Sequence, residues 1–469
     1  MGVKMKIMNT NLENISHQKF LNINYGYRYL FDIEKGNIFN SKNKDIIRID
    51  SILNKIKQTL ISKGELDNTY KLINMENVSS KFNLTFDYTE VQNIESDKIL
   101  IGTGDFLLPK MSAYSGKFIL NKNKEIYICS TEFMEYKIND SLYLPKFFYY
   151  LFRTSKMLEN LKYLESGKAQ RRLNDYSLSM LYLPKLDIKM QMEVLKQITP
   201  LEEDIFQKIK RIKSVQEIID NVFQKKFKIS YIDELKQEKK IYFSNFLELA
   251  NDELKCATTL KTQKIFFETL KKIDGIKWIN IGKISNIKGG KRLPKGDIFV
   301  ENETEYRYIK VEDLDSNGYF NIDSIKYISS ETNKKIKDYI ANTDNILVSI
   351  VGTIGKVGCV PEELDGENIS ENFACIVLND LSKFNPKFIR YYLQTSLCKT
   401  QFKELVTKAV QEKLAIFRLK KIFIPYLVLK EQKEIIDEIE KQIENQIEIE
   451  EEIFNIQDQI SNIIEKNII

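Results

Sequence analysis

The chain has very little of the residue on which most acid-base catalysis depends, since His17 is the single histidine among 469 residues. His17 lies in a polar stretch near the N-terminus, where we expect a surface side chain, so histidine-based catalysis is not indicated. The 5 cysteines are odd in number and form no Cys-x-x-Cys pair. The sequence therefore predicts neither a disulfide framework nor a zinc site.

The motifs of a DNA-modifying enzyme are also missing. The 8 prolines are isolated from one another, so the chain has no Asp/Asn-Pro-Pro-aromatic loop of the kind expected in an adenine amino-methyltransferase. Gly102-Thr-Gly104 leads into strand-like sequence rather than into a helix, which argues against a cofactor-binding loop. The scattered carboxylates mark no nuclease site. We expect no catalytic residue, no metal site and no cofactor bound by this chain.

Long apolar runs and a strong net charge are absent too. No segment approaches the ~18 apolar residues of a membrane span, and residues 1–10 carry lysines without an apolar core behind them. We therefore expect a cytoplasmic protein without a membrane partner. The net charge of +5 is weakly basic, so only a local basic patch would argue for nucleic-acid binding.

What the chain does contain is a repeat of very long period. Four segments recur in the same order in the two halves: residues 70–78 and 306–314, 104–117 and 343–356, 145–151 and 386–393, and 166–191 and 407–432. Gln411, Pro425 and Gln432 follow Gln170, Pro184 and Gln191 at one constant offset of 241 residues. Four ordered matches predict two copies of one domain.

Each copy is followed by a segment, 189–229 and 429–469, in which apolar residues recur every three or four positions between polar ones. A helix of about 38 residues would be ~57 Å long, which is longer than a domain core requires. This length favours pairing of the two helices as an antiparallel coiled coil, although each helix could instead pack on its own core. Pro200 predicts a kink or restart in the first helix.

The predicted fold class is α+β, with two tandem domains, each followed by a long helix, and with the two helices paired as an antiparallel coiled coil. Residues 118–120 and 346–351 are predicted strands, whereas 288–296 and 364–368 are predicted loops. Leu183-Pro184 and Ile424-Pro425 are each expected to end a strand before the helix. The predicted boundaries are 1–188, 189–229, 230–428 with a possible helical connection at 230–272, and 429–469.

This organisation resembles the specificity subunits of type I restriction-modification systems over nearly the whole chain. The likeness is strongest in Gly352–Lys356, Gln411 with Leu414, Ile424-Pro425 and Glu431-Gln432. The first half departs at Ala113–Lys117, and residues 1 to about 45 have no counterpart. The resemblance implies that the two tandem domains are target-recognition domains and that the paired helices are a spacer. It implies a non-catalytic subunit that reads a bipartite target in double-stranded DNA. It also implies two modification (methyltransferase) subunits and restriction/translocase subunits as partners, which would use S-adenosylmethionine, ATP and Mg.

Candidate DNA contacts form three groups. The first is a basic glycine-containing loop, for which a merely solvated loop is the alternative; it consists of Lys288, Lys291, Arg292 and Lys295. The second surrounds Gly352–Lys356, which is not a Walker A loop because Val357 replaces the required Ser/Thr. As a turn between strands it would present Ser349, Thr353 and Lys356 to DNA, with Ser112, Tyr114 and Lys117 in the first copy, unless it only joins the strands.

The third group accompanies the recurring glutamine and consists of Gln170, Arg171, Arg172, Gln411 and Lys413. Gln can pair with adenine and Arg with guanine. Because the glutamine recurs while its neighbours vary, we favour backbone contact over base reading. Two other classes of function stay open: a stand-alone nuclease with duplicated DNA-binding domains, and a coiled-coil scaffold without DNA affinity.

Overall fold

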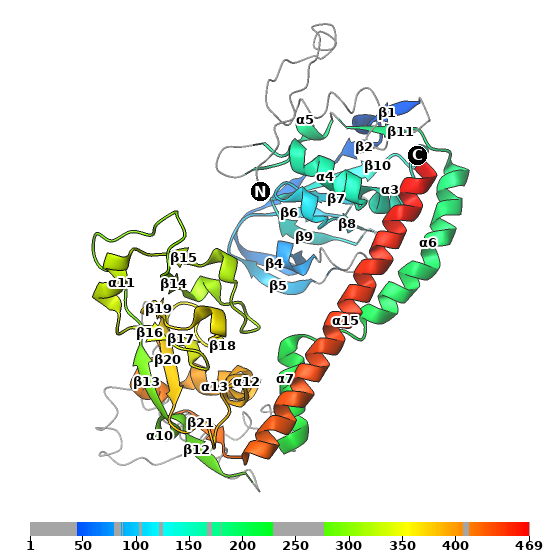
Figure 1. The fold of residues 1–469 in the computed structure, drawn as a ribbon. Coiled ribbons are helices and arrows are strands. Elements are labelled where there is room, and N and C mark those ends of the chain that lie inside the picture. The colour runs from blue at the N-terminus through cyan, green and yellow to red at the C-terminus, as the bar shows by residue number, and fades with distance from the viewer. Residues whose placement is uncertain are drawn as a thin grey trace. The chain divides into compact units, whose positions relative to one another are not determined.

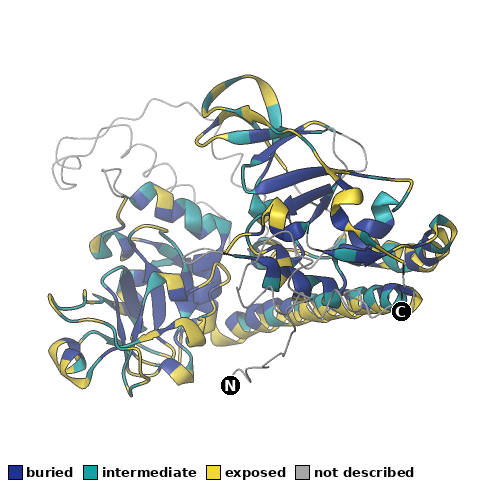
Figure 2. Ribbon diagram, turned by 90° about the horizontal axis from the view of Figure 1, so that it is seen from above, coloured by how far each residue is buried: buried dark blue, intermediate teal, exposed yellow. Residues whose placement is uncertain are grey.

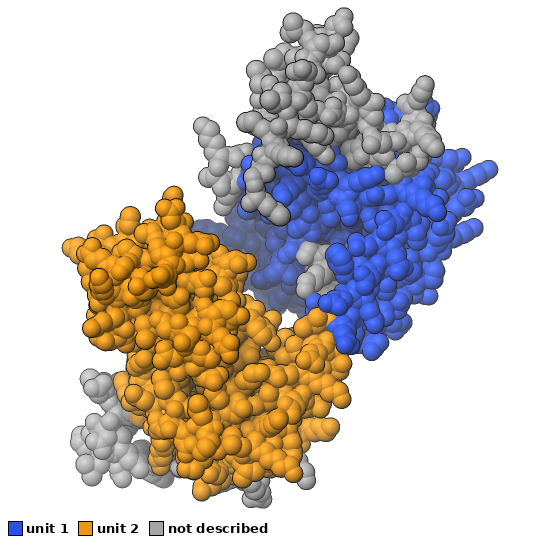
Figure 3. Space-filling view, in the orientation of Figure 1, with its two compact units in different colours: residues 1–212, 448–469 blue, residues 213–447 orange. Residues whose placement is uncertain are grey.

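A computed structural model describes residues 45–78, 86, 88–102, 106–121, 125–166, 171–179, 181–227, 276–406 and 412–468. The chain divides into two compact units (Figure 3): unit 1 contains residues 1–212 and 448–469, and unit 2 contains residues 213–447. The segment before residue 45 and the predicted helical connection at 230–272 lie outside the described residues.

Unit 1 contains three sheets, in the orders β2-β10-β7-β8, β3-β6-β9-β4-β5 and β1-β11. Their strands are β1 (Ile46–Arg48), β2 (Leu53–Lys55), β3 (Thr59–Ile61), β4 (Gly64–Ile73), β5 (Thr89–Ile94), β6 (Lys98–Ile101), β7 (Phe106–Pro109), β8 (Ile119–Leu120), β9 (Tyr127–Ser130), β10 (Phe133–Ile138) and β11 (Tyr182–Pro184). All described pairings are antiparallel except that of β4 with β9.

Unit 2 contains the corresponding sheets, in the orders β13-β20-β17-β18, β16-β19-β14-β15 and β12-β21. Their strands are β12 (Trp278–Asn280), β13 (Ser285–Gly289), β14 (Arg307–Ile309), β15 (Lys326–Tyr327), β16 (Ile340–Ala341), β17 (Ile346–Ser349), β18 (Val357–Cys359), β19 (Glu367–Ile369), β20 (Phe373–Leu378) and β21 (Phe423–Pro425). The parallel pair again lies in the second sheet, between β14 and β19. Apart from β3, the strand order of unit 1 is repeated, which confirms the duplication predicted from sequence.

The helices are drawn in Figure 1, and those of unit 1 have counterparts in the same order in the second half of the chain, where further helices are added. In unit 1 they are α3 (Pro145–Phe152), α4 (Ser155–Leu164), α5 (Asp175–Leu178) and α6 (Ile188–Ile209). Unit 2 has α7 (Val215–Phe227), α10 (Ile281–Ile284), α11 (Ser330–Ile336), α12 (Pro386–Gln394), α13 (Ser396–Leu405) and α14 (Ile416–Leu419). Helix α15 (Leu429–Ile468) contributes its first part to unit 2 and its last part to unit 1. No helix among the described residues is long and apolar enough to cross a membrane.

The strands β7 and β17, inside the four-stranded sheet of each unit, are buried on both faces. Their successive residues point to opposite sides of the sheet and so enter two different cores. In β17, Ile346 and Val348 pack with the helices, while Leu347 packs in the core formed with the second sheet. In β7, Phe106 takes the helix side and Leu107 the other. These strands therefore appear in the sequence as continuous apolar runs.

Each unit also contains a packed pair of helices. In unit 1, the end of α6 meets α15 at an ion pair between Lys208 Nζ and Glu452 Oε2, 2.6 Å apart. In unit 2, the Lys213 backbone N–H donates to Gln446 Oε1 at 2.7 Å, and Lys226 lies 3.4 Å from Glu431. The partner's number falls as the chain advances, so α7 and α15 are antiparallel. Buried residues form one side of α15 (Figure 2).

The long helix predicted over 189–229, with a kink or restart at Pro200, is two helices, and the break between them does not lie at Pro200. Helix α6 continues through Pro200 to Ile209, and α7 begins at Val215. The Glu217 backbone N–H donates to Ser214 Oγ at 3.1 Å, and the Ser214 N–H donates to the Glu217 carboxylate at 2.7 Å. This reciprocal capping starts a new helix at a Ser-x-x-Glu sequence, a signal that the apolar periodicity obscured.

The predicted strands at 118–120 and 346–351 are confirmed as β8 and β17, and β11 and β21 end at the two expected prolines. Two loop predictions were wrong in part. Lys288 and Gly289 belong to β13, and Glu367 and Asn368 belong to β19. Asn368 is buried, and its side-chain amide is satisfied there because it donates to the Ile336 carbonyl at 2.9 Å.

Candidate nucleic-acid interface

Three segments of unit 2 meet at one end of its four-stranded sheet. Gly289 at the end of β13 pairs with Ala374, and Ser349 at the end of β17 pairs with Phe373. The segments that follow β13 and β17 therefore leave the sheet at the same end. We call this region the loop end of unit 2; it comprises residues 289–295, 350–356 and 412–418.

The basic loop of the first group is fixed by a close backbone approach. The Gly290 N–H donates to the Phe373 carbonyl at 3.2 Å, and a Cβ at Gly290 would lie 2.1 Å from the Ser370 carbonyl oxygen. Only glycine is compatible with that contact. The next residue, Lys291, is held by its carbonyl, which accepts from the Tyr308 hydroxyl at 2.7 Å.

The cations of this loop remain accessible. Lys291, Arg292 and Lys295 are exposed, and Lys288 is half-buried in β13. Lys291 Nζ lies 5.4 Å from the centre of the Tyr339 ring. Arg292 Nε lies 2.6 Å from Glu371 Oε1, a hydrogen bond that raises the pKa of Arg292, yet its side chain is 81% exposed. The loop can therefore present fixed positive charge to an anion.

The second group has mainly a structural role in unit 2. Ser349 is completely buried; its hydroxyl donates to the Thr353 carbonyl at 2.5 Å and accepts from the Lys356 N–H at 2.9 Å. Lys356 Nζ donates to the carbonyls of Leu314 and Val311, at 2.6 and 3.3 Å. The side chains of Ser349 and Lys356, for which the sequence predicted DNA contact, thus make hydrogen bonds that hold the turn within its own domain. Thr353 is exposed.

Unit 1 repeats this arrangement. Lys117 Nζ donates to the Met75 carbonyl at 3.0 Å, and Met75 begins the 3₁₀ turn that corresponds to the one begun by Val311. The ammonium group of Lys117 is therefore also hydrogen-bonded within its own domain. Ser112 is exposed with a left-handed backbone, φ 51°. Tyr114 is exposed, and Lys162 Nζ lies 5.7 Å from its ring.

The third group lies beside the second in both units. Gln170 and Gln411 lie outside the described residues. The Leu173 N–H donates to the Lys110 carbonyl at 2.7 Å, and the Leu414 N–H donates to the Ile350 carbonyl at 2.9 Å.

The effect of these two bonds is to bring exposed cations to the turns. In unit 1, Arg171 and Arg172 approach the segment that contains Ser112. Arg172 also forms an ion pair with Glu132 at 3.0 Å. In unit 2, the backbone of the exposed Lys413 forms an isolated antiparallel β-bridge with Val351, which immediately precedes the Gly352–Lys356 turn.

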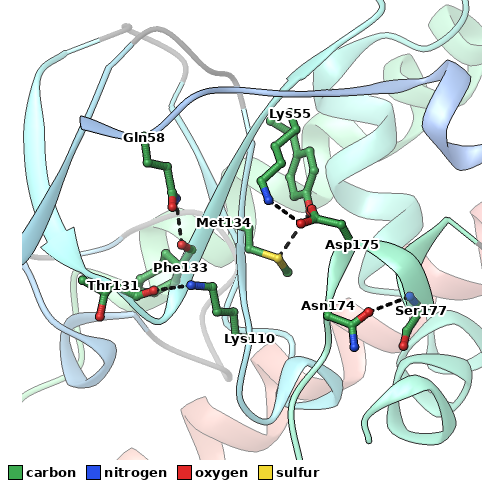
Figure 4. Close-up of polar contacts among 10 residues, drawn as sticks. Lys55, Gln58, Lys110, Thr131, Phe133, Met134, Asn174, Asp175 and Ser177 are labelled. Atoms are coloured by element: carbon green, nitrogen blue, oxygen red, sulfur yellow. Dashed lines mark hydrogen bonds and ion pairs between the residues drawn. The ribbon is translucent and has the colours of Figure 1, made fainter. Parts of the chain in front are cut away.

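Two further lysines, which the sequence did not single out, lie at the corresponding end of the unit 1 sheet (Figure 4). Lys55 is paired with Asp175, and Lys110 Nζ donates to the Thr131 carbonyl at 2.5 Å. Burial acts to raise the pKa of Asp175, but hydrogen bonds from Lys55 and Tyr136 dominate and lower it. Lys55 lies outside the four recurring segments, so the repeat could not identify it as a candidate. Its place at the end of β2 is what brings it to this end of the sheet. We call residues 55–58, 110–116 and 171–176 the loop end of unit 1.

A buried glutamine joins each sheet domain to the helix that follows it. Gln432 Oε1 accepts from the Asn385 N–H at 2.8 Å, and its Nε2 donates to the Lys383 and Leu427 carbonyls, both at 2.8 Å. Gln191 repeats this pattern with the Leu144 N–H and with carbonyls at positions 142 and 186. The recurrence of these glutamines is therefore explained by domain-to-helix attachment.

Within the described ranges, no group of three or more His, Cys, Asp or Glu side chains is arranged to hold a metal ion.

Comparison with known proteins adds a family match in each half. A model described as the type I restriction modification DNA specificity domain matches residues 40–217 and 273–458. The chain is similar to the type I restriction enzyme EcoBI specificity subunit of Escherichia coli, with 26% identity over 155 residues. That match covers 33% of this chain and 32% of the E. coli protein.

Two further similarities were found. The HindI specificity subunit of Haemophilus influenzae is 26% identical over 145 residues, which cover 29% of this chain and 32% of that protein. The match thus spans about a third of the length of each of these two relatives. The crystal structure of the HsdS subunit from Thermoanaerobacter tengcongensis is 13% identical, with 90% of this chain and 96% of that chain covered and a TM-score of 0.36.

Proposed function

Because the chain belongs to the family defined by the type I restriction modification DNA specificity domain, which it contains twice, we propose that it is the DNA-recognition subunit of a type I restriction-modification complex. It reads a bipartite target in double-stranded DNA, with one half-site for each domain. It is not a catalyst. Two modification subunits and the restriction/translocase subunits dock on it, and these partners use S-adenosylmethionine, ATP and Mg.

The observation that carries the proposal is the recurrence of exposed cations at the loop end of each unit. Arg171 and Arg172 supply them in unit 1, and Lys291, Arg292 and Lys413 supply them in unit 2. Most protein-DNA hydrogen bonds go to phosphate and sugar, and a smaller set of contacts reads base edges. Two such surfaces on one chain suit a target of two half-sites.

In this function, the long helices set the distance between the two recognition domains and so between the two half-sites. The contacts of α6 and α7 with α15 support an antiparallel coiled coil. The 40 residues of α15 span ~60 Å, whereas half-sites one DNA turn apart are separated by ~34 Å. Stems of this length can hold two readers at such a separation. The base pairs between the half-sites are then left unread.

The test is selection from randomised duplex DNA by the chain assembled with its modification subunits. The expected result is a motif of two blocks separated by a constant number of unselected positions. A single block, or no enrichment, would contradict the proposal. A stand-alone nuclease predicts instead that the purified chain cleaves DNA with a divalent metal, and we expect no cleavage.

A further inference from the structure

A large aromatic side chain is exposed at the same point of both units. Tyr176, on the one-turn helix α5, is 39% exposed, and Phe417, on the one-turn helix α14, is 53% exposed. The two residues are separated by the offset of 241 that relates the other matched segments. Single exposed apolar residues are common, but recurrence at equivalent positions of diverged copies points to a shared purpose.

In unit 2, Phe417 belongs to the loop end. The preceding residue, Ile416, packs so close to the end of β13 that a Cβ at Gly289 would lie 3.3 Å from Ile416 Cδ1. On the other side, Arg418 donates to the Leu405 carbonyl at 3.2 Å, and its guanidinium lies 5.5 Å from the Phe417 ring. Leu419 is completely buried. The neighbours of Phe417 are thus anchored while its ring is exposed.

In unit 1, α5 is anchored in the same manner. The Ser177 N–H donates to Asn174 Oδ1 at 2.9 Å, which caps the helix, and the Asp175 carboxylate binds Lys55 and accepts from the Tyr136 hydroxyl at 2.6 Å. Figure 4 shows Asn174, Asp175 and Ser177 on the side of the sheet where Lys55 and Lys110 lie. Tyr176 is therefore set between fixed residues at the loop end of unit 1.

The charge around the two rings indicates what covers them. Arg171 and Arg172 are close in sequence to Tyr176, and Lys413 and Lys420 flank α14; all four are exposed. The carboxylates Glu132 and Glu371 are already engaged with Arg172 and Arg292. An exposed aromatic ring with exposed cations near it in the chain suits a ligand that combines an anionic backbone with apolar and aromatic groups, and duplex DNA is such a ligand.

We propose that Tyr176 and Phe417 each make the apolar contact with bases of their own half-site, beside the cations that bind the phosphates. The inference rests on the proposed function and extends it to the residues that discriminate bases. The apolar group that the major groove offers is the thymine C5 methyl, against which an aromatic edge can pack. Tyr176 adds a hydroxyl that Phe417 lacks, so the two half-sites are read differently.

The experiment uses the full chain assembled with its modification subunits and the two-block duplex that the wild-type complex selects. Phe417→Ala and Tyr176→Ala are compared with two more exposed apolar controls away from the loop ends. Leu381→Ala changes a residue just beyond Leu378, at the opposite end of β20 from Phe373, and Phe454→Ala changes one on α15; these residues are 56% and 61% exposed.

We expect each aromatic variant to bind about tenfold more weakly than wild type, with an unchanged melting temperature and an unchanged dependence on salt, because no ionic contact is removed. Repeated selection should lose preference in one block only, a different block for each variant. Deoxyuridine in place of thymine should weaken wild-type binding at one position in each block. In Phe417→Ala and in Tyr176→Ala, the position in the block that loses its aromatic contact should no longer respond, while the position in the other block should respond as in wild type. The two control variants should behave as wild type.

Several results would overturn the inference while leaving the proposed function standing. They are wild-type affinity and selection in both aromatic variants, an equal loss in both blocks, a reduced salt slope, or a selected motif in which no thymine responds to deoxyuridine. If Phe417→Ala lowers the melting temperature, Phe417→Gln, which keeps a long side chain, must still lose the preference. If the wild-type complex selects no two-block motif, the proposed function fails, and this inference fails with it.

Discussion

At the scale of single residues, the basic side chains fall into two groups: those that donate to carbonyls of their own domain, and those that are exposed. Lys356 and Lys117 direct their ammonium groups onto backbone carbonyls of their own domain. Lys291 and Arg292 are exposed at a loop end. A Gly-Lys pair at a turn is compatible with either direction of the side chain, so spacing alone identified the turn and not the role of its lysine. The structure adds the acceptor, which lies on a different segment.

The exposed basic side chains should contribute to the salt dependence of DNA binding. Replacement of both Lys291 and Arg292 by Ala should weaken binding and lower the slope of log K against log [salt] by about 1 for each phosphate that the variant no longer neutralises. Titrations from low to moderate salt measure this slope. Lys334→Ala, an exposed change on α11, is the matched control. An unchanged slope would exclude the basic loop from the interface.

The lysines that donate to backbone carbonyls of their own domain should contribute to its stability. Lys356→Met keeps the stem but removes the donor to the Leu314 carbonyl, so the free energy of unfolding should fall by about 1 to 3 kcal/mol. Chemical denaturation measures this loss. The salt slope of DNA binding should stay at the wild-type value. A lower slope with full stability would return Lys356 to the DNA interface.

At the scale of elements, strands were easier to predict than helix ends. The apolar runs of β8 and β17 follow from burial on both faces, which composition reports directly. The break between α6 and α7 depends on two side chains, Ser214 and Glu217, inside an apolar stripe that continues across it. Periodicity averages over such a local capping interaction, so it predicted a single helix.

The attachment of each helix to its sheet domain should depend on one buried glutamine. Gln432→Ala would leave the Asn385 N–H and two carbonyls without their partner, each costing about 1 to 3 kcal/mol when it stays buried. We expect a loss of several kcal/mol and a markedly lower melting temperature. Gln442→Ala, on the same helix, removes only an exposed hydrogen bond to Glu438 and should be nearly neutral. Equal melting temperatures for the two variants would show that the buried amide is not needed.

At the scale of the whole molecule, the duplication was predictable because equivalent positions keep the same residues at a constant offset. Gln191 and Gln432 illustrate this, since both are completely buried and both bind one N–H and two carbonyls. The base-contacting residues were not predictable in the same manner. A recognition surface diverges when two copies read different sequences, and Tyr176 aligned with Phe417 has no motif that marks it.

The length of the helices should set the number of unread base pairs. Removal of seven residues, about two turns or 10 Å, from α6 and from the facing part of α15 keeps the apolar stripe in phase. The selected spacer should shorten by about 3 base pairs, and both blocks should keep their sequences. Selection from randomised DNA reads this out. A spacer of wild-type length would refute the role of the helices as a ruler.

The division of α15 between the units has a consequence for biosynthesis. Residues 448–469 complete unit 1, where Ile453, Ile460 and Ile464 are buried with Val194 and Ile198 of α6. While the ribosome is still making unit 2, α6 can pack on its own sheet domain but lacks the residues of α15 that cover its other side. Unit 1 is therefore completed only after unit 2 has been made, and truncation of the chain before residue 448 would damage unit 1 more than unit 2.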